Sequence, residues 1–430
     1  MEFNKRITIL GFFLTYFTLS IFEYYYLNSI PVFYFNVLNI DRTLLGFLQL
    51  IAYIFTFFTP LTGFFYEKYV KKNSHRKIIL IASNCGLGIG FLIFILFKEI
   101  PYLFVLFLVI YLYSISMIRT IMINFFLSIS KQSESIKDRL IFIVKTSRIC
   151  GFLVISLFFR LNFFNLYSIQ FWNFFFVGGL IISIFLIVIV IVLSKKLLLI
   201  LFEYEHNVPE KVNMKKKQNQ KKEKNLMVSM YISYFLGSSD AIFIFLFSSW
   251  IWDKFGESQY IFYSSIYFIF ILGEFLGNFI AQFLCKRYEK RKIMFSGLIL
   301  YNFLMISLIF SNFPIVLILK FLLFFTASIA NFTYTSFTAS LTINEKWKTF
   351  KYQLLNTFGS LASIVFIPIG TMLSTFIDFE VLVIISSIFF FMASTTISAT
   401  FLLQDDNRGE KKVLEPTIKS LSKLDAKLRN

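Results

Sequence analysis

The sequence consists largely of apolar stretches of about 20 residues, the length at which an α-helix crosses a bilayer core about 30 Å thick. Short clusters of charged residues separate these stretches. Twelve stretches are expected to span the membrane, at residues 7–28, 44–66, 78–97, 101–125, 140–160, 171–194, 226–250, 260–284, 293–311, 314–337, 352–375 and 379–403. The pattern therefore predicts an all-α polytopic membrane protein with 12 transmembrane helices.

The composition argues against soluble function classes. Charged residues make up only 15% of the chain, whereas soluble domains carry roughly 25%. The net charge of +18 does not indicate nucleic-acid binding, because the basic residues lie in short clusters between apolar stretches rather than on a soluble module. Cys85, Cys150 and Cys285 are far apart and have no His nearby at ligand spacing. We therefore expect no disulfide framework, no metal site and no cofactor.

The basic residues also predict the orientation of the chain. Alternate loops on one side, together with both termini, carry 34 Lys and Arg residues, and the opposite loops carry 4. Because cytoplasmic loops are enriched in Lys and Arg, the 34-residue side is expected to be cytoplasmic. We predict a multi-pass protein of the plasma membrane with both termini inside.

A long polar tract divides the spans into two sets of six. Residues 195–225 contain 9 Lys and too few apolar side chains to fold alone, which indicates a basic cytoplasmic linker. The expected organisation is a six-helix bundle at 1–194, this linker, a second bundle at 226–403, and a cytoplasmic tail at 404–430. Weak internal similarity favours a repeat, since Pro101 opens the fourth span and Pro314 opens the tenth. Six plus six helices in parallel repetition is a transporter architecture.

The loop after the second span carries a recognisable motif. Residues 63–72 read GFFYEKYVKK, which resembles the inner-loop signature of the major facilitator superfamily, G-x-x-x-D-R-x-G-R-R. Valine replaces the second glycine of that signature. The residues in matching roles are Gly63, Glu67, Lys68, Lys71 and Lys72. The second-half copy, residues 281–290, is more degraded and has Cys285 where the first copy has its acid.

The motif also has a physical rationale of its own. Gly63 allows one helix to approach another closely, as packing in lipid requires. Glu67 lies one turn later and is expected to interact with the positive N-terminal end of the eleventh helix, near Phe350. The resemblance implies that this contact latches the inner mouth. The alternative is that cytoplasmic orientation alone explains Lys71 and Lys72.

Ionisable residues inside the spans are the candidate substrate and coupling residues, because charge in the membrane is costly. They are Glu23, Arg119, Lys145, Arg148, Asp240, Glu274 and Lys320. The resemblance implies that the first, fourth, seventh and tenth helices line a central cavity. Glu23 and Asp240 fall on the first and seventh helices, and Arg119 and Lys320 on the fourth and tenth.

Estimated depth separates these candidates. Asp240 lies about 20 Å and Glu274 about 15 Å from the inner ends of their spans, so neither acid is expected to reach water. Glu23, Lys320 and Arg119 lie about 8–9 Å from one end of their spans and are close enough to extend to the interface. We interpret Lys145 and Arg148 as anchoring residues at the inner rim. Gly273 and Gly277 lie on either side of Glu274 in the sequence, and their spacing predicts a surface for close helix packing.

The sequence favours a secondary transporter that moves a small organic solute by alternating access, with the proton as coupling ion. Asp240 is the favoured coupling acid, and Glu274 is second. The expected partners are the solute, the proton and membrane lipid, and the protein is expected to be a monomer that binds no nucleic acid. A lipid-linked precursor flippase and a polytopic membrane enzyme remain the alternatives.

Overall fold

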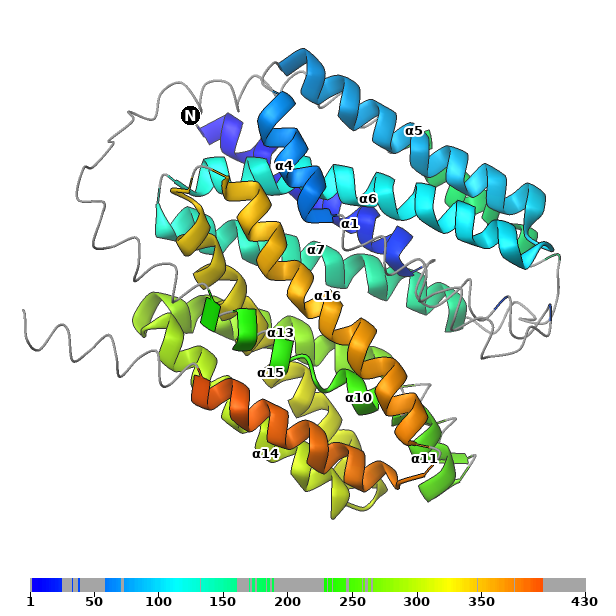
Figure 1. The fold of residues 1–430 in the computed structure, drawn as a ribbon, viewed down its shortest axis with the longest axis vertical. Coiled ribbons are helices and arrows are strands. Elements are labelled where there is room, and N and C mark those ends of the chain that lie inside the picture. The colour runs from blue at the N-terminus through cyan, green and yellow to red at the C-terminus, as the bar shows by residue number, and fades with distance from the viewer. Residues whose placement is uncertain are drawn as a thin grey trace, which may run out of the picture.

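The computed structural model describes most of residues 2–24, 59–160, 170–188, 228–263, 266–374 and 376–396, together with residues 33 and 38. These residues are almost entirely helical and form two groups that lie side by side (Figure 1). The first group contains α1 (Glu2–Tyr24), α4 (Thr59–Tyr69), α5 (Asn73–Phe97), α6 (Pro101–Ser130) and α7 (Glu134–Arg160). The second contains α10 (Ala241–Ile244), α11 (Phe247–Phe255), α13 (Tyr267–Arg287), α14 (Lys290–Ile309), α15 (Phe313–Thr342), α16 (Lys348–Leu373) and the helical segment Phe379–Thr396.

Six helices of the described residues are long and apolar enough to cross a membrane. They coincide with the third, fourth, eighth, ninth, tenth and twelfth expected spans. The first, fifth and eleventh expected spans fall on α1, α7 and α16. The second, sixth and seventh are described only in part, and the linker at 195–225 and the tail at 404–430 lie outside the described residues.

Local sequence signals fix where several helices begin. Pro101 begins α6, and Pro314 stands in the first turn of α15, as the sequence predicted. The Asn312 side chain caps α15 by accepting a hydrogen bond from the Ile315 amide at 3.2 Å. The Ser133 hydroxyl caps α7 in the same way. These caps supply partners for amides that a helix start leaves without an internal acceptor.

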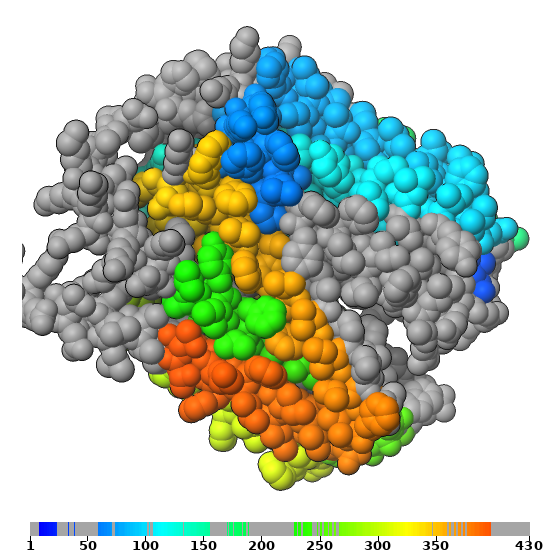
Figure 2. Space-filling model, viewed as in Figure 1, coloured from blue at the N-terminus to red at the C-terminus, as the bar shows by residue number. Residues whose placement is uncertain are grey.

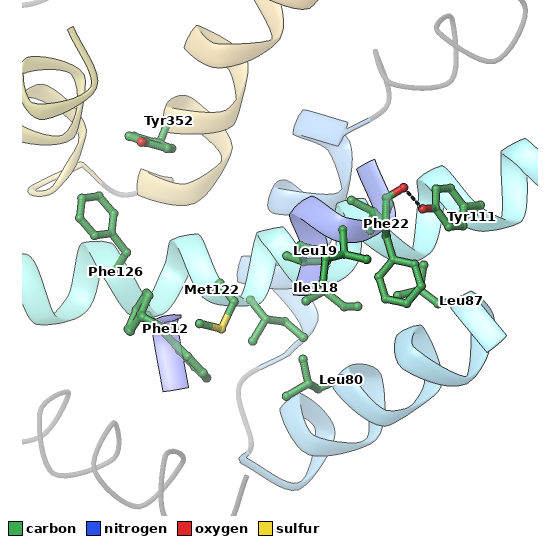
Figure 3. Close-up of a cluster of buried hydrophobic side chains, with 14 of the residues drawn as sticks. Phe12, Leu19, Phe22, Leu80, Leu87, Tyr111, Ile118, Met122, Phe126 and Tyr352 are labelled. Atoms are coloured by element: carbon green, nitrogen blue, oxygen red, sulfur yellow. Dashed lines mark hydrogen bonds between the residues drawn. The ribbon is translucent and has the colours of Figure 1, made fainter. Parts of the chain in front are cut away.

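Aromatic and aliphatic side chains fill the interior of the first group, and the cluster continues to Tyr352 of α16 in the second (Figure 3). Phe22 of α1 packs against Phe91 of α5 and Tyr111 of α6, with ring centres 5.5 and 6.1 Å apart. The Tyr111 hydroxyl also donates a hydrogen bond to the Phe22 carbonyl. Because the Phe22 carbonyl accepts this hydrogen bond, the Tyr111 hydroxyl has a partner within the apolar core. The second group has a core of its own.

The seventh span is interrupted near its middle. Residues 237–240 form successive turns before α10 begins. The amides of Ser238 and Ser239 bond to carbonyls three residues earlier, at 3.2 and 3.1 Å. The segment after the break packs tightly on α16, because a Cβ added at Gly370 would lie 2.9 Å from the Ile242 Cα. The break puts turn backbone and the Asp240 side chain near the middle of the seventh expected span.

The two groups meet closely at one end of the molecule. In Figure 2 the blue atoms of α4 lie directly against the yellow and orange atoms around the start of α16. Helix α7 packs against α13 and α15. We call this the closed end, where α4 and α6 end and where α7, α14 and α16 begin.

Candidate functional site

One acid and two arginines meet among α1, α6 and α7. Glu23 is only 7% exposed, and its carboxylate forms ion pairs with Arg119 of α6 and Arg148 of α7. The distance from the carboxylate to Arg148 Nε is 3.4 Å. The Arg148 guanidinium also lies over the Phe152 ring, 5.3 Å from its centre. A buried charge inside the membrane is therefore paired rather than isolated.

A lysine of α7 joins the first group to the second. Lys145 Nζ donates a hydrogen bond to Asn331 Oδ1 of α15 at 3.0 Å. The same ammonium lies close enough to Glu274 of α13 for the two charges to attract each other. One turn before Lys145, the Phe142 ring contacts Phe275 of α13, with ring centres 6.3 Å apart. Glu274 thus lies at the boundary between the groups, although its helix belongs to the second.

The second group holds a matching acid and base. Asp240, at the end of the helix break, accepts a hydrogen bond from the Tyr301 hydroxyl of α14 at 2.9 Å. Lys320 of α15 is 6% exposed and lies close enough to Asp240 for their charges to interact. Its ammonium lies 3.8 Å from the centre of the Phe247 ring, which supplies a cation–π contact.

The structure thus pairs Glu23 with Arg119 and places Lys320 near enough to Asp240 for their charges to interact. Glu23 and Lys320, which the sequence placed close enough to extend to the interface, are both buried. The interpretation of Arg148 as a rim residue is wrong, since its side chain reaches Glu23. Depth counted from uncertain helix ends cannot place the tips of such long side chains.

At the closed end, Glu67 binds the start of α16. Its two carboxylate oxygens accept hydrogen bonds from the amides of Thr349 and Phe350, at 2.8 and 3.4 Å. These are the second and third residues of α16 and have no acceptor within their own helix. The negative charge also lies at the positive end of the helix dipole. The contact expected from the sequence is present.

Gly63 lies one turn before Glu67 and faces the same helix. A Cβ added at Gly63 would lie 3.2 Å from the Phe350 Cα and would collide with the Gln353 side chain. Gln353 in turn donates a hydrogen bond to Thr120 of α6 at 2.6 Å. Glycine at this position therefore allows α4 and α16 to approach closely, and the approach brings Glu67 to the amides of α16.

The lysines of the motif are placed differently. Lys68 is exposed, and its ammonium lies 5.6 Å from the centre of the Phe64 ring. The Phe64 ring packs against Trp347, just before α16, with ring centres 4.9 Å apart. Lys71 and Lys72 lie outside the described residues. Beside this contact, Lys348 donates a hydrogen bond to Ser128 of α6 at 2.6 Å.

A second polar cluster, which the sequence analysis missed, joins α7 to α14 and α15 at the same end. Lys290, the first residue of α14, forms ion pairs with Glu134 at 2.7 Å and Asp138 at 3.1 Å. Ser336 of α15 donates to Asp138, and Lys137 donates to another serine of α15. We call Glu134, Lys137, Asp138, Lys290 and Ser336 the second latch.

Ionisation within the second latch follows these contacts. Burial alone would raise the pKa of Glu134, but hydrogen bonds from Lys137 and Lys290 bring it below its usual value. Burial lowers the pKa of Lys137, and the neighbouring acids offset this only in part. Since 68% of the Glu134 side chain is exposed, its ion pairs contribute little in water, and the buried Asp138 is the stronger anchor.

The two contacts at the closed end are similar in position but opposite in charge. In the first, an acid of the motif loop binds a helix start in the other group. In the second, the equivalent loop position is Cys285, which is buried and contacts Thr333, so it supplies no charge. The acids instead stand in the first turns of α7, and the loop contributes Lys290. The degraded second copy of the motif therefore lies at the same boundary, but its loop supplies the base of the contact instead of the acid.

Comparisons with known proteins agree with this fold. The sequence model of the Major Facilitator Superfamily matches residues 226–425. A crystal structure of a variant of the E. coli fucose:proton symporter FucP aligns with a TM-score of 0.61 at 14% identity, covering 91% of this chain and 98% of that one. A structure of FucP in the outward conformation aligns with a TM-score of 0.60 at 14% identity, covering 92% and 98%. No curated protein sequence matches the chain.

The sequence match covers the second helical group, and the structural likeness extends across both groups. The helices long enough to cross a membrane agree with both findings. Both findings point to a transporter rather than to a polytopic membrane enzyme. Residues 226–425 of this multi-pass membrane protein match the Major Facilitator Superfamily, and the chain has the fold of the transporter FucP.

Proposed function

We propose that the protein moves a small organic solute across the membrane by alternating access. One observation carries this proposal, which is that most of the polar contacts described between the two helical groups gather at the closed end. Glu67 binds α16 there, and Lys290 binds Asp138. Groups held together at one end by hydrogen bonds and ion pairs can separate at that end and close at the other. The similarity to FucP in its outward conformation supports the same view.

The proposal includes the full architecture expected from the sequence. Twelve helices form bundles at 1–194 and 226–403, joined by the linker at 195–225 and followed by the tail at 404–430. The closed end faces the cytoplasm of a plasma-membrane protein that works as a monomer. The strongest support is the basic asymmetry of the loops, with 34 Lys and Arg residues on one side and 4 on the other.

Orientation can be tested at Asn219 in the linker. A single cysteine placed there, in a chain whose native cysteines are replaced by serine, should react with a membrane-impermeant thiol reagent only after the membrane is opened. A cysteine at Asp253, in an expected outer loop, is the matched control and should react in intact cells. Labelling at Asn219 in intact cells would reverse the orientation.

Asp240 is proposed as the proton-coupling acid, and Glu274 is the second candidate. Asp240 stands at a helix break, where turn backbone and the Tyr301 hydroxyl surround the carboxylate. Lys320 lies near enough to stabilise the charged form and to compete with the proton. A group that can exchange an ammonium partner for a proton is suited to coupling, whereas a permanent pair with Lys320 would only hold helices together.

The test begins with metabolite profiling of cells with and without the protein, which identifies a solute, followed by uptake in proteoliposomes. We expect a pH gradient to drive accumulation in the parent protein. Asp240→Asn should abolish that accumulation and spare solute exchange at equal pH, because exchange does not require proton release. Glu274→Gln, which removes the other deep acid, is the matched comparison and should retain at least part of the accumulation.

If both variants still accumulate the solute under a pH gradient, proton coupling through these acids is wrong. If the parent protein moves no solute that profiling identifies, the transport proposal itself fails for that solute class.

A further inference from the structure

The cluster around Glu23 carries an excess of positive charge. Arg119 and Arg148 share the Glu23 carboxylate, and within the described part of the chain neither guanidinium is paired with a second acid. Arg148 also lies close enough to both Arg119 and Lys145 for their charges to repel. Lys145 lies close enough to Glu274 for their charges to attract each other. Three cations therefore face two acids in one continuous cluster.

The two arginines keep most of their hydrogen-bonding capacity. A guanidinium has five N–H donors, and one carboxylate shared between two arginines cannot accept from all of them. The Arg119 side chain is 40% exposed and that of Arg148 is 45% exposed, although Glu23 between them is buried. The donors that do not bind Glu23 therefore remain accessible to a solute.

Their surroundings hold the guanidiniums in place. Glu23 binds both, which reduces the repulsion between them. The Phe152 ring supports the face of Arg148 at 5.3 Å. A guanidinium fork that is fixed in this way matches the oxygens of a carboxylate or a phosphate. A neutral solute would leave the excess charge uncompensated in a membrane interior.

We propose that the transported solute carries an anionic oxygen group, of the carboxylate or phosphate type, and that Arg148 binds it together with Arg119. Glu23 positions the two guanidiniums. This assignment of substrate class rests on the proposed transport function, since Glu23 and Arg119 stand on the first and fourth spans, which the resemblance places at a central cavity.

The first experiment measures the charge that a solute meets at this site and needs no knowledge of the substrate. In a chain whose native cysteines are replaced by serine, Phe152→Cys places a thiol one turn from Arg148 on the same face of α7. The purified protein in nanodiscs is treated with an anionic methanethiosulfonate, the sulfonatoethyl reagent, and with a cationic one, the trimethylammonioethyl reagent. The two reaction rates are compared with those of a free thiol.

We expect the anionic reagent to be favoured by about tenfold relative to the free thiol, the effect of a nearby uncompensated charge. Adding Arg148→Gln should remove most of that preference, and Arg148→Lys should retain it because the charge remains. An equal preference with and without Arg148 would overturn the assignment. So would failure of both reagents to react, because the site would then be closed to solutes.

The second experiment separates this inference from the proposed function. In proteoliposomes, the solute found by profiling should be an anion, and Arg148→Gln should reduce its uptake at least tenfold. Arg148→Lys should restore part of the uptake, since it keeps the charge but lacks the fork. Transport of an uncharged solute that Arg148→Gln leaves unchanged would overturn the anion site and leave the transport function standing. A strong preference for the anionic reagent in a protein that moves no solute would support the anion site and contradict the proposed transport function.

Discussion

In the variant Glu67→Gln, the closed end is expected to open far more often than in the parent protein. The carboxylate accepts hydrogen bonds from Thr349 and Phe350 at the positive end of α16. Removing its charge should cost about 1–2 kcal/mol of closure, because both a charge-assisted hydrogen bond and a dipole interaction are weakened. That energy corresponds to a factor of roughly 5–30 in the ratio of closed to open molecules.

Spin labels at Lys131, after α6, and Lys292, in the first turn of α14, would report this change as a distance distribution across the closed end. Both side chains are exposed and belong to different helical groups. Glu289→Gln is the matched control, since it removes an acid at the same end whose ion pair, at 3.9 Å, is with its neighbour Arg291. If Glu67→Gln gives the same distribution as the parent, cytoplasmic orientation alone would explain the motif.

The substitution Gly277→Leu is expected to destabilise the whole protein. A Cβ at this position of α13 would lie 2.9 Å from the Ser328 Cβ of α15 and would collide with the Phe325 carbonyl. Because the obstacle includes helix backbone, the added side chain fits only if α13 and α15 separate. Overpacking of this kind costs about 1–3 kcal/mol. A lower unfolding temperature and a smaller monodisperse yield in detergent should follow.

Leu276→Phe is the control for added bulk on α13. Leu276 is 43% exposed, so the larger ring has open space on the outer surface of the helix and should leave the unfolding temperature unchanged. Equal unfolding temperatures for Gly277→Leu and the parent would mean that the close packing of α13 and α15 contributes no stability.

Much of this arrangement could be predicted because it depends on local pattern. Apolar length located the long helices, and the prolines located two of their starts. Glycine at 273 and 277 predicted close packing, and an added Cβ at Gly273 would indeed lie 2.8 Å from the Phe321 carbonyl. Glu67 could be matched to α16 because both stand at helix ends on the same expected side.

Other features could not be predicted because they depend on which helices face each other. Glu134 and Asp138 fall between the fourth and fifth expected spans, whereas they stand in the first turns of α7 and bind Lys290. Arg148 was placed by its Cα depth, but the ion pair forms at the end of a long side chain. The helix break at 237–240 did have a local signal, since Gly-Ser-Ser-Asp favours turns over helix.

The chemistry of the closed end determines how easily it can reopen. Many of the contacts that hold it, from Glu67 to Lys290, are hydrogen bonds and ion pairs, which lie beside apolar contacts such as Phe64 on Trp347. When water enters, each donor and acceptor exchanges a protein partner for a water molecule, so the net loss is only about 0.5–1.5 kcal/mol for each bond. Apolar side chains that bury the same area would form no such bonds with water when the end opens. Hydration can therefore offset much of the cost of breaking these polar contacts, whereas the apolar contacts between the groups lose their partners when the end opens.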